Sequence, residues 1–150
     1  MVEVAQRMLS YASGVDEPPL LDQTIGDNLS ATVQRFGDRE ALVECATGRR
    51  WTYTEFFEAT RRIATALLQR GIQPGDRVGI WSPNTAEWAI IQYATAQIGA
   101  ILVTINPAYR TEELEYVLNQ SSIAMVLSAE SFKTSDYTEM LHAVGSRCPH

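Results

Sequence analysis

The stretch GAILVTINPAYRTEELEYVL, residues 99–118, decides the fold. Residues 101–103 are a short run of aliphatic side chains of the kind buried in parallel sheets, and we predict a central strand there. Asn106 and Pro107 end this strand, since proline supplies no N–H donor to a sheet. Thr111 is a good N-cap residue, and the acidic side chains after it suit the first turn of a helix. The stretch therefore predicts a strand, a turn and a helix.

Helices and strands continue to alternate upstream of this stretch. Thr52 and Glu55 have the spacing of a capping box, and they open the helix with the clearest apolar face, which runs to Leu68. A strand is expected at residues 77–81. Asn84 is then the expected N-cap of a further helix, which is apolar on nearly all sides and should therefore be buried on more than one.

The downstream part repeats the same alternation. Residues 124–127 form the next expected strand, and Ser135 or Asp136 can cap a last helix that runs to Val144. Alternation of this kind results from right-handed crossovers between parallel strands. We therefore predict an α/β fold of alternating helices and mostly parallel strands.

The N-terminal part is expected to hold a lead-in and a short hairpin. Residues 1–21 contain a possible short helix and then a double proline, which marks a linker. A helix follows from Thr24, and residues 41–43 and 51–53 should pair as a hairpin. We therefore divide the chain into this lead-in and a partial α/β subdomain, residues 22–150.

The composition excludes several classes of protein. With a net charge of −6 and 12 scattered Lys and Arg residues, the chain lacks the clustered basic side chains that nucleic-acid binding needs. Cys45 and Cys148 form no CxxC pair and, without a recognisable signal peptide, favour a reducing compartment and inert thiols. No apolar run approaches the roughly 20 residues that span a bilayer. We therefore expect a soluble, cytoplasmic protein that spans no membrane and binds no nucleic acid.

Two motifs resemble those of the AMP-forming acyl-CoA synthetases, in the superfamily of adenylate-forming enzymes. Residues 99–118 are similar to a signature of this family: a helix ending in Gly-Ala, a strand, Asn-Pro and a Glu-rich helix. The sequence WTYTEF, residues 51–56, resembles the superfamily's early Thr-Tyr-x-Glu-Leu motif. The sequence NPAYRTEELEY, residues 106–116, is most similar to that of the fatty-acid branch of the family. The resemblance covers about residues 22–144, and it implies an incomplete part of the family's large N-terminal domain.

The resemblance implies a two-step reaction for the complete enzyme. The carboxylate of a fatty acid attacks the α-phosphate of Mg-ATP to give an acyl-adenylate and pyrophosphate, and the CoA thiolate then displaces AMP. Fatty acid, ATP, Mg and CoA are therefore implied as substrates and cofactors. The family's phosphate loop, ribose-binding acidic residue and C-terminal lysine are not found before His150. We therefore predict that this segment alone is inactive, holds no catalytic residue and binds no cofactor.

The loop of residues 106–110 is the best candidate site. Ligands of open α/β sheets bind beyond the carboxyl ends of strands, where helix N-termini present N–H groups to anions. Arg110 can pair with a phosphate and Tyr109 can stack on a base. The resemblance implies that this loop lies near the surface that meets the CoA nucleotide, so Tyr109 and Arg110 are the candidate cofactor-binding residues. A solvated loop kept for its turn geometry is the alternative.

Other catalytic and metal-binding patterns are missing from the sequence. There is no Walker-type phosphate loop, glycine-rich dinucleotide loop, serine-hydrolase elbow or HExxH motif. His142 is expected on the polar side of the last helix, and His150 lies at the chain end. Because a metal site would need further ligands at suitable spacing, we predict none.

A second function belongs to a different class. The chain could be a stand-alone interaction module, a degenerate half of a synthetase that binds a protein partner. A sheet edge left open would favour such binding and also self-association. A monomer that folds cooperatively would support this alternative, and an aggregating chain would support the synthetase segment.

Overall fold

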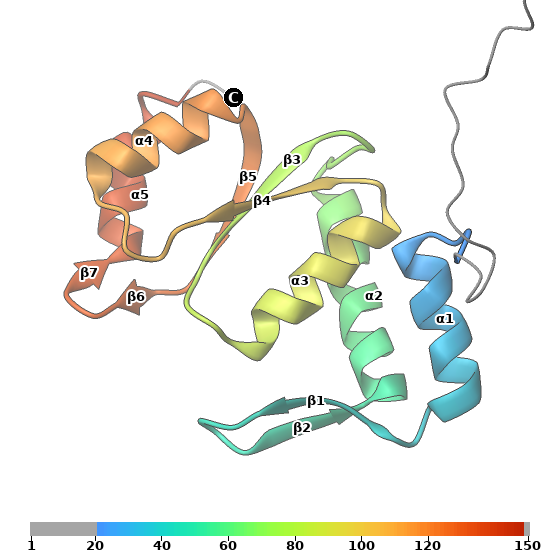
Figure 1. Cartoon of the computed structure of the whole chain (residues 1–150). Helices are drawn as coiled ribbons and strands as arrows, with labels where there is room; N and C mark the ends of the chain where they lie inside the picture. The colour runs from blue at the N-terminus through green and yellow to red at the C-terminus, as the bar shows by residue number, and fades with distance from the viewer. Residues whose placement is uncertain (1–20, 149–150) are drawn as a thin grey trace, which may run out of the picture.

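The computed structural model describes residues 21–148, so the helix expected in the lead-in lies outside the described residues. Helices and strands alternate along the chain as predicted (Figure 1). The elements are α1 (Ile25–Phe36), β1 (Glu40–Glu44), β2 (Arg49–Thr52), α2 (Tyr53–Gln69), β3 (Arg77–Trp81), α3 (Ala86–Gln97), β4 (Ile101–Ile105), α4 (Thr111–Gln120), β5 (Ile123–Ser128), β6 (Ser131–Phe132), β7 (Ser135–Asp136) and α5 (Tyr137–Gly145).

Three parallel strands form the central sheet, in the order β4-β3-β5. Helices α4 and α5 pack on one face, and α2 and α3 pack on the other, so the sheet is the middle of three layers (Figure 1). The antiparallel strands β1 and β2 form the predicted hairpin apart from this sheet. The predicted α/β fold with a mostly parallel sheet is confirmed.

Within the described residues β4 is an edge strand, and the prediction that it lies at the centre is wrong. The centre belongs to β3, which is buried from residue 78 to residue 81, whereas Ile101 in β4 is 52% exposed. Gly79 lets β3 fit between its neighbours, since a Cβ there would lie 3.1 Å from the side chains of Ile105 and Ile123. An apolar run indicates a strand, but it shows neither which neighbours the strand has nor how far each side chain is buried.

Apolar side chains fill the space on each face of the sheet. On one face lies the group that we call the α4–α5 core. On the other face, α2 and α3 pack against the sheet, and α1 packs against α2 and α3. The α4–α5 core consists of Trp81, Ile105, Leu114, Leu118, Ile123, Tyr137 and Val144. Leu67, Ile72 and Val78 are buried where α2 meets the other face of the sheet, and a separate group lies between α1, α2 and α3: Leu29, Phe56, Ala59 and Ile90.

The capping box predicted for α2 is confirmed. The Thr52 N–H donates to Glu55 Oε2 at 2.8 Å, and the Glu55 N–H donates to Thr52 Oγ1 at 3.2 Å. Because Thr52 is the N-cap, Tyr53 is the first helical residue and β2 ends one residue earlier than expected. Leu68, expected on the apolar face, is 50% exposed. Gly71 follows the helix with a φ of 89° and supplies a left-handed turn, a conformation that glycine adopts without strain.

The start of α4 differs from prediction by one residue. The N-cap is Arg110, and Thr111 is the first helical residue. The Arg110 N–H donates to the carboxylate of Glu113 at 2.8 Å, so an acidic side chain inside the helix satisfies this end. Strands β6 and β7 form a small hairpin before α5 that the sequence did not indicate.

Candidate functional site

The strand order places a topological switch point between β3 and β5. Because β4 and β5 lie on opposite sides of β3, the crossover helices α3 and α4 lie on opposite faces of the sheet. Ligands of such sheets bind outside the carboxyl ends of the strands at this point. A hollow of about 320 Å³, which we call the switch-point hollow, lies here. Its lining comes from the ends of β3 and β5 and the start of α3: Ile80, Ser82, Thr85, Glu87, Ile91, Leu127, Ser128 and Ala129.

Two carboxylates occupy the N-terminus of α3 beside this hollow. Glu44 accepts hydrogen bonds from the Ala86 N–H at 2.9 Å and from Arg49 Nε at 2.9 Å. Glu87 also pairs with Arg49, at 2.9 Å from Nη1. The bond from Arg49 is the main reason that the pKa of Glu44 is about 2 and the pKa of Glu87 is lowered. Both carboxylates are ionised at neutral pH, so the hollow does not favour a phosphate.

This arrangement replaces the cap expected for α3. The N-cap is Thr85 rather than Asn84, and its side chain makes no capping hydrogen bond. The β1–β2 hairpin supplies Glu44 instead. A cap from a residue so distant in the chain has no local sequence signal, which is why the predicted Asn84 cap was wrong.

The hairpin cap predicts a change of stability with pH. Glu44 has an ordinary pKa of 4.5 and a folded-state pKa of about 2. Its contribution to stability is therefore complete above pH 4.5 and is lost as the pH falls towards 2. We expect Glu44→Gln to lower the urea midpoint at pH 7 and to lower it less at each step from pH 4.5 to pH 2.5. Glu58→Gln, on the exposed face of α2, is the control and should leave the midpoint close to the wild-type value at every pH. A Glu44→Gln effect that stayed constant over this range would contradict the assignment.

Two stacked aromatic side chains hold the loop of residues 106–110. Trp81 and Tyr137 lie 3.5 Å apart between ring centroids with an interplanar angle of 10°. The Trp81 indole N–H donates to the Asn106 carbonyl at 3.0 Å, and the Tyr137 hydroxyl donates to the Pro107 carbonyl at 2.5 Å. Burial raises the pKa of Tyr137, so its hydroxyl remains a donor at neutral pH. We call this pair the Trp81–Tyr137 clamp.

The two candidate residues of this loop face different surroundings. Tyr109 is half-buried and packs against the α4–α5 core. Arg110 is exposed, and its guanidinium donates to Ser135 Oγ at 2.8 Å and to Thr134 Oγ1 at 3.2 Å. The structure thus brings Arg110 to the β6–β7 hairpin rather than to the switch-point hollow. A guanidinium has five N–H donors, so donors remain for a phosphate.

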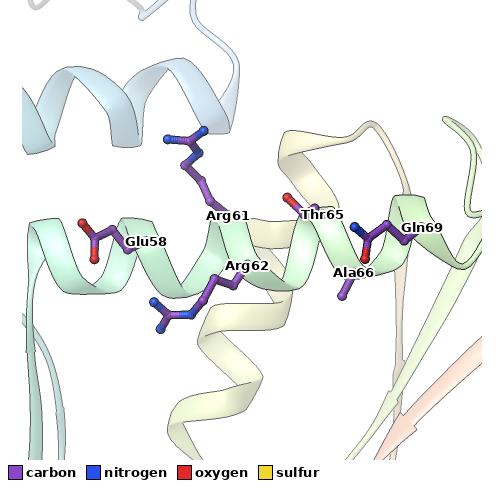
Figure 2. A pocket seen from close by; sticks show the side chains of 6 residues that line it. All are labelled: Glu58, Arg61, Arg62, Thr65, Ala66 and Gln69. Atoms are coloured by element: carbon purple, nitrogen blue, oxygen red, sulfur yellow. The ribbon is translucent and has the colours of Figure 1, made fainter.

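A second, shallow hollow runs along α2 (Figure 2). All its lining residues come from this one helix, and Figure 2 shows the side chains of Arg61 and Arg62 pointing in different directions. Glu58 and Gln69 belong to the same surface, which is the exposed polar face of this helix. Side chains that do not converge offer no ligand-binding geometry, so the hollow is the solvated face of α2.

Other candidate chemistry is sparse in residues 21–148. They hold no group of three His, Cys, Asp or Glu side chains arranged to bind a metal ion. None of the described helices combines the length and apolar character that crossing a bilayer requires. Cys45 is exposed and Cys148 is half-buried, both as thiols, and burial raises the pKa of Cys148. His142 is exposed on α5, as predicted, and His150 lies outside the described residues.

The family model of the AMP-binding enzymes matches residues 29–149. The chain belongs to the AMP-binding enzyme family. Among its relatives, the mitochondrial medium-chain acyl-CoA ligase of mouse (Mus musculus) is 43% identical over 94% of this chain. The match covers 22% of that relative, so the chain spans about a fifth of the length of a family member.

Two solved structures share the fold. The N-terminal domain of FACL13 from Mycobacterium tuberculosis, crystallised with an inhibitor, has a TM-score of 0.74 and 28% identity. That comparison covers 82% of this chain and 30% of the other. An anthranilate CoA ligase in complex with anthranoyl-AMP has a TM-score of 0.77 over 91% of this chain and 25% of the other. At 20% identity, it supports the fold alone.

Proposed function

We propose that this chain is the N-terminal segment of an AMP-forming fatty acid CoA ligase. The single observation that carries the proposal is the family match across residues 29–149, which includes all three strands of the sheet. The ligase would convert a fatty acid and ATP to an acyl-adenylate and then transfer the acyl group to CoA. The name of the mouse relative favours a medium-chain acid as the substrate.

The role proposed for the segment itself is structural. It would supply a rigid three-layer scaffold on which the rest of the ligase builds the site for ATP, Mg and the fatty acid. The described residues hold no metal-binding cluster, and the helix N-terminus at the switch-point hollow is occupied by carboxylates. We therefore expect the chain alone to bind no ATP and to form no acyl-adenylate.

A chimeric ligase tests this proposal. Residues 22–148 would replace the matching segment of the mouse medium-chain acyl-CoA ligase, and pyrophosphate release would be measured with octanoate and ATP. We expect a rate within about tenfold of the parent, a small change in activation free energy. The 150-residue chain alone and the mouse enzyme without this segment are the controls and should release none. A folded chimera that releases no pyrophosphate would rule the proposal out.

The same chimera tests the CoA contact proposed for Tyr109 and Arg110. Loss of a charge-assisted bond to phosphate should raise the KM for CoA about tenfold in Arg110→Ala. Arg62→Ala, on the solvated face of α2, is the matched control. A KM for CoA that equals the control value would end the hypothesis and leave Arg110 with the structural role described above.

The second candidate function, an interaction module, is supported by the edge of β4. This strand carries no charged residue, and its Ile101 is 52% exposed, so the edge lacks the usual protection against pairing with another chain. Self-association through this edge is a proposal that light scattering after size-exclusion chromatography decides.

The cytoplasmic location also stays a prediction; the mouse relative is named as mitochondrial.

A further inference from the structure

The Trp81–Tyr137 clamp joins three parts of the chain that are distant in sequence. Trp81 ends the central strand β3, and Tyr137 opens α5. Both side chains are fully buried in the α4–α5 core, with 0% of their surface exposed. Their rings lie nearly parallel in contact, which fixes each ring against the other.

The polar atoms of both rings meet the same loop. The Trp81 N–H and the Tyr137 O–H donate to the carbonyls of two consecutive residues, Asn106 and Pro107. These two carbonyls follow the end of β4, where the ladder with β3 no longer pairs them. A buried N–H or O–H group that lacks a hydrogen-bond partner destabilises the folded state. The loop carbonyls supply these partners for the two rings.

Further hydrogen bonds define the rest of the loop. The Asn106 side chain accepts from the Ala108 N–H at 2.9 Å, and the Asn106 carbonyl also accepts from the Tyr109 N–H at 3.1 Å. Arg110 donates to Thr134 and Ser135, which lie just before Tyr137 in the chain. The segment from Thr134 to Tyr137 therefore contacts both ends of the loop.

We infer that Trp81 and Tyr137 are positioning residues for the loop of residues 106–110. Their N–H and O–H groups set the shape of the loop and so the direction in which it presents Arg110. What the loop binds rests on the function proposed above, but its order does not depend on any ligand. Ring burial alone would stabilise the whole core without holding these two carbonyls.

Hydrogen exchange measured by mass spectrometry tests the inference on the 150-residue chain without ligand. Tyr137→Phe and Trp81→Phe each keep an aromatic ring and remove one donor to the loop. We expect exchange in a peptide covering the amides of residues 108–111 to rise about fivefold, the effect of losing one ordinary hydrogen bond. Peptides from α1 and α2, on the other face of the sheet, should exchange at the wild-type rate. Tyr93→Phe is the matched control, since Tyr93 packs against Phe56 on that other face.

Two results would overturn the inference. The first is loop exchange at the wild-type rate in both variants, which would mean that the two donors do not order the loop. The second is a uniform rise in exchange over the whole chain, including outright unfolding, which would mean that the rings act through general stability. Because no substrate is present, either result is independent of the outcome with the chimeric ligase.

Discussion

Replacing Trp81 by alanine should lower the free energy of unfolding by about 3–5 kcal/mol, the usual cost of removing a fully buried aromatic side chain. Trp81, the last residue of the central strand β3, has 0% exposure and stacks on Tyr137. Its loss would leave a cavity between β3 and α5 and remove the donor to the Asn106 carbonyl. Since single domains are stable by roughly 5–15 kcal/mol, this loss is a large fraction of the total stability.

Urea unfolding followed by circular dichroism measures this loss. Trp88→Ala is the matched control, because Trp88 is a half-buried tryptophan on α3 that lines an open groove beside β4. The control should lose clearly less stability, since less of its surface leaves water on folding. Equal losses in the two variants would mean that Trp81 is not buried as described.

Leu114→Ala should cost about 2–5 kcal/mol. Leu114 is fully buried in the α4–α5 core, where α4 meets the sheet, and alanine would leave an empty space that close packing cannot fill. The matched control is Leu68→Ala, the same substitution at a helical leucine that is 50% exposed. Its expected loss is below about 1 kcal/mol, because most of the deleted surface was not buried. The urea midpoints of the two variants measure these costs. A larger loss for Leu68→Ala than for Leu114→Ala would contradict the burial assigned to the two leucines.

Local signals explain which parts of the fold could be predicted from sequence. The capping box of Thr52 and Glu55 and the left-handed Gly71 both act within a few residues, so the boundaries of α2 follow from the sequence alone. The alternation of expected helices and strands likewise indicated a parallel α/β sheet. The position of β4 did not follow, because strand order depends on contacts between residues far apart in the chain. Gly79 fits the central position of β3 because it has no Cβ, and this matters only once folding brings Ile105 and Ile123 beside it.

The candidate site shows the same limit. The sequence drew attention to the loop of residues 106–110, and the structure places this loop at the carboxyl edge of the sheet. The sequence did not indicate that Trp81 and Tyr137 would both contact this loop, nor that Glu44 would cap α3. In each case the two hydrogen-bonded residues are far apart in the sequence and come together only when the chain folds. An aromatic residue at the end of a predicted strand, as Trp81 is, was the signal that could have been used.

Thioester formation by the chimeric ligase tests the central claim most directly. The claim is that residues 22–148 form the N-terminal scaffold of a fatty acid CoA ligase and can serve as one. The measurement is the amount of octanoyl-CoA formed from octanoate, ATP, Mg and CoA, determined by mass spectrometry. We predict octanoyl-CoA from the chimera and none from the 150-residue chain alone. A chimera that folds with the stability of its parent and forms no octanoyl-CoA would contradict the account.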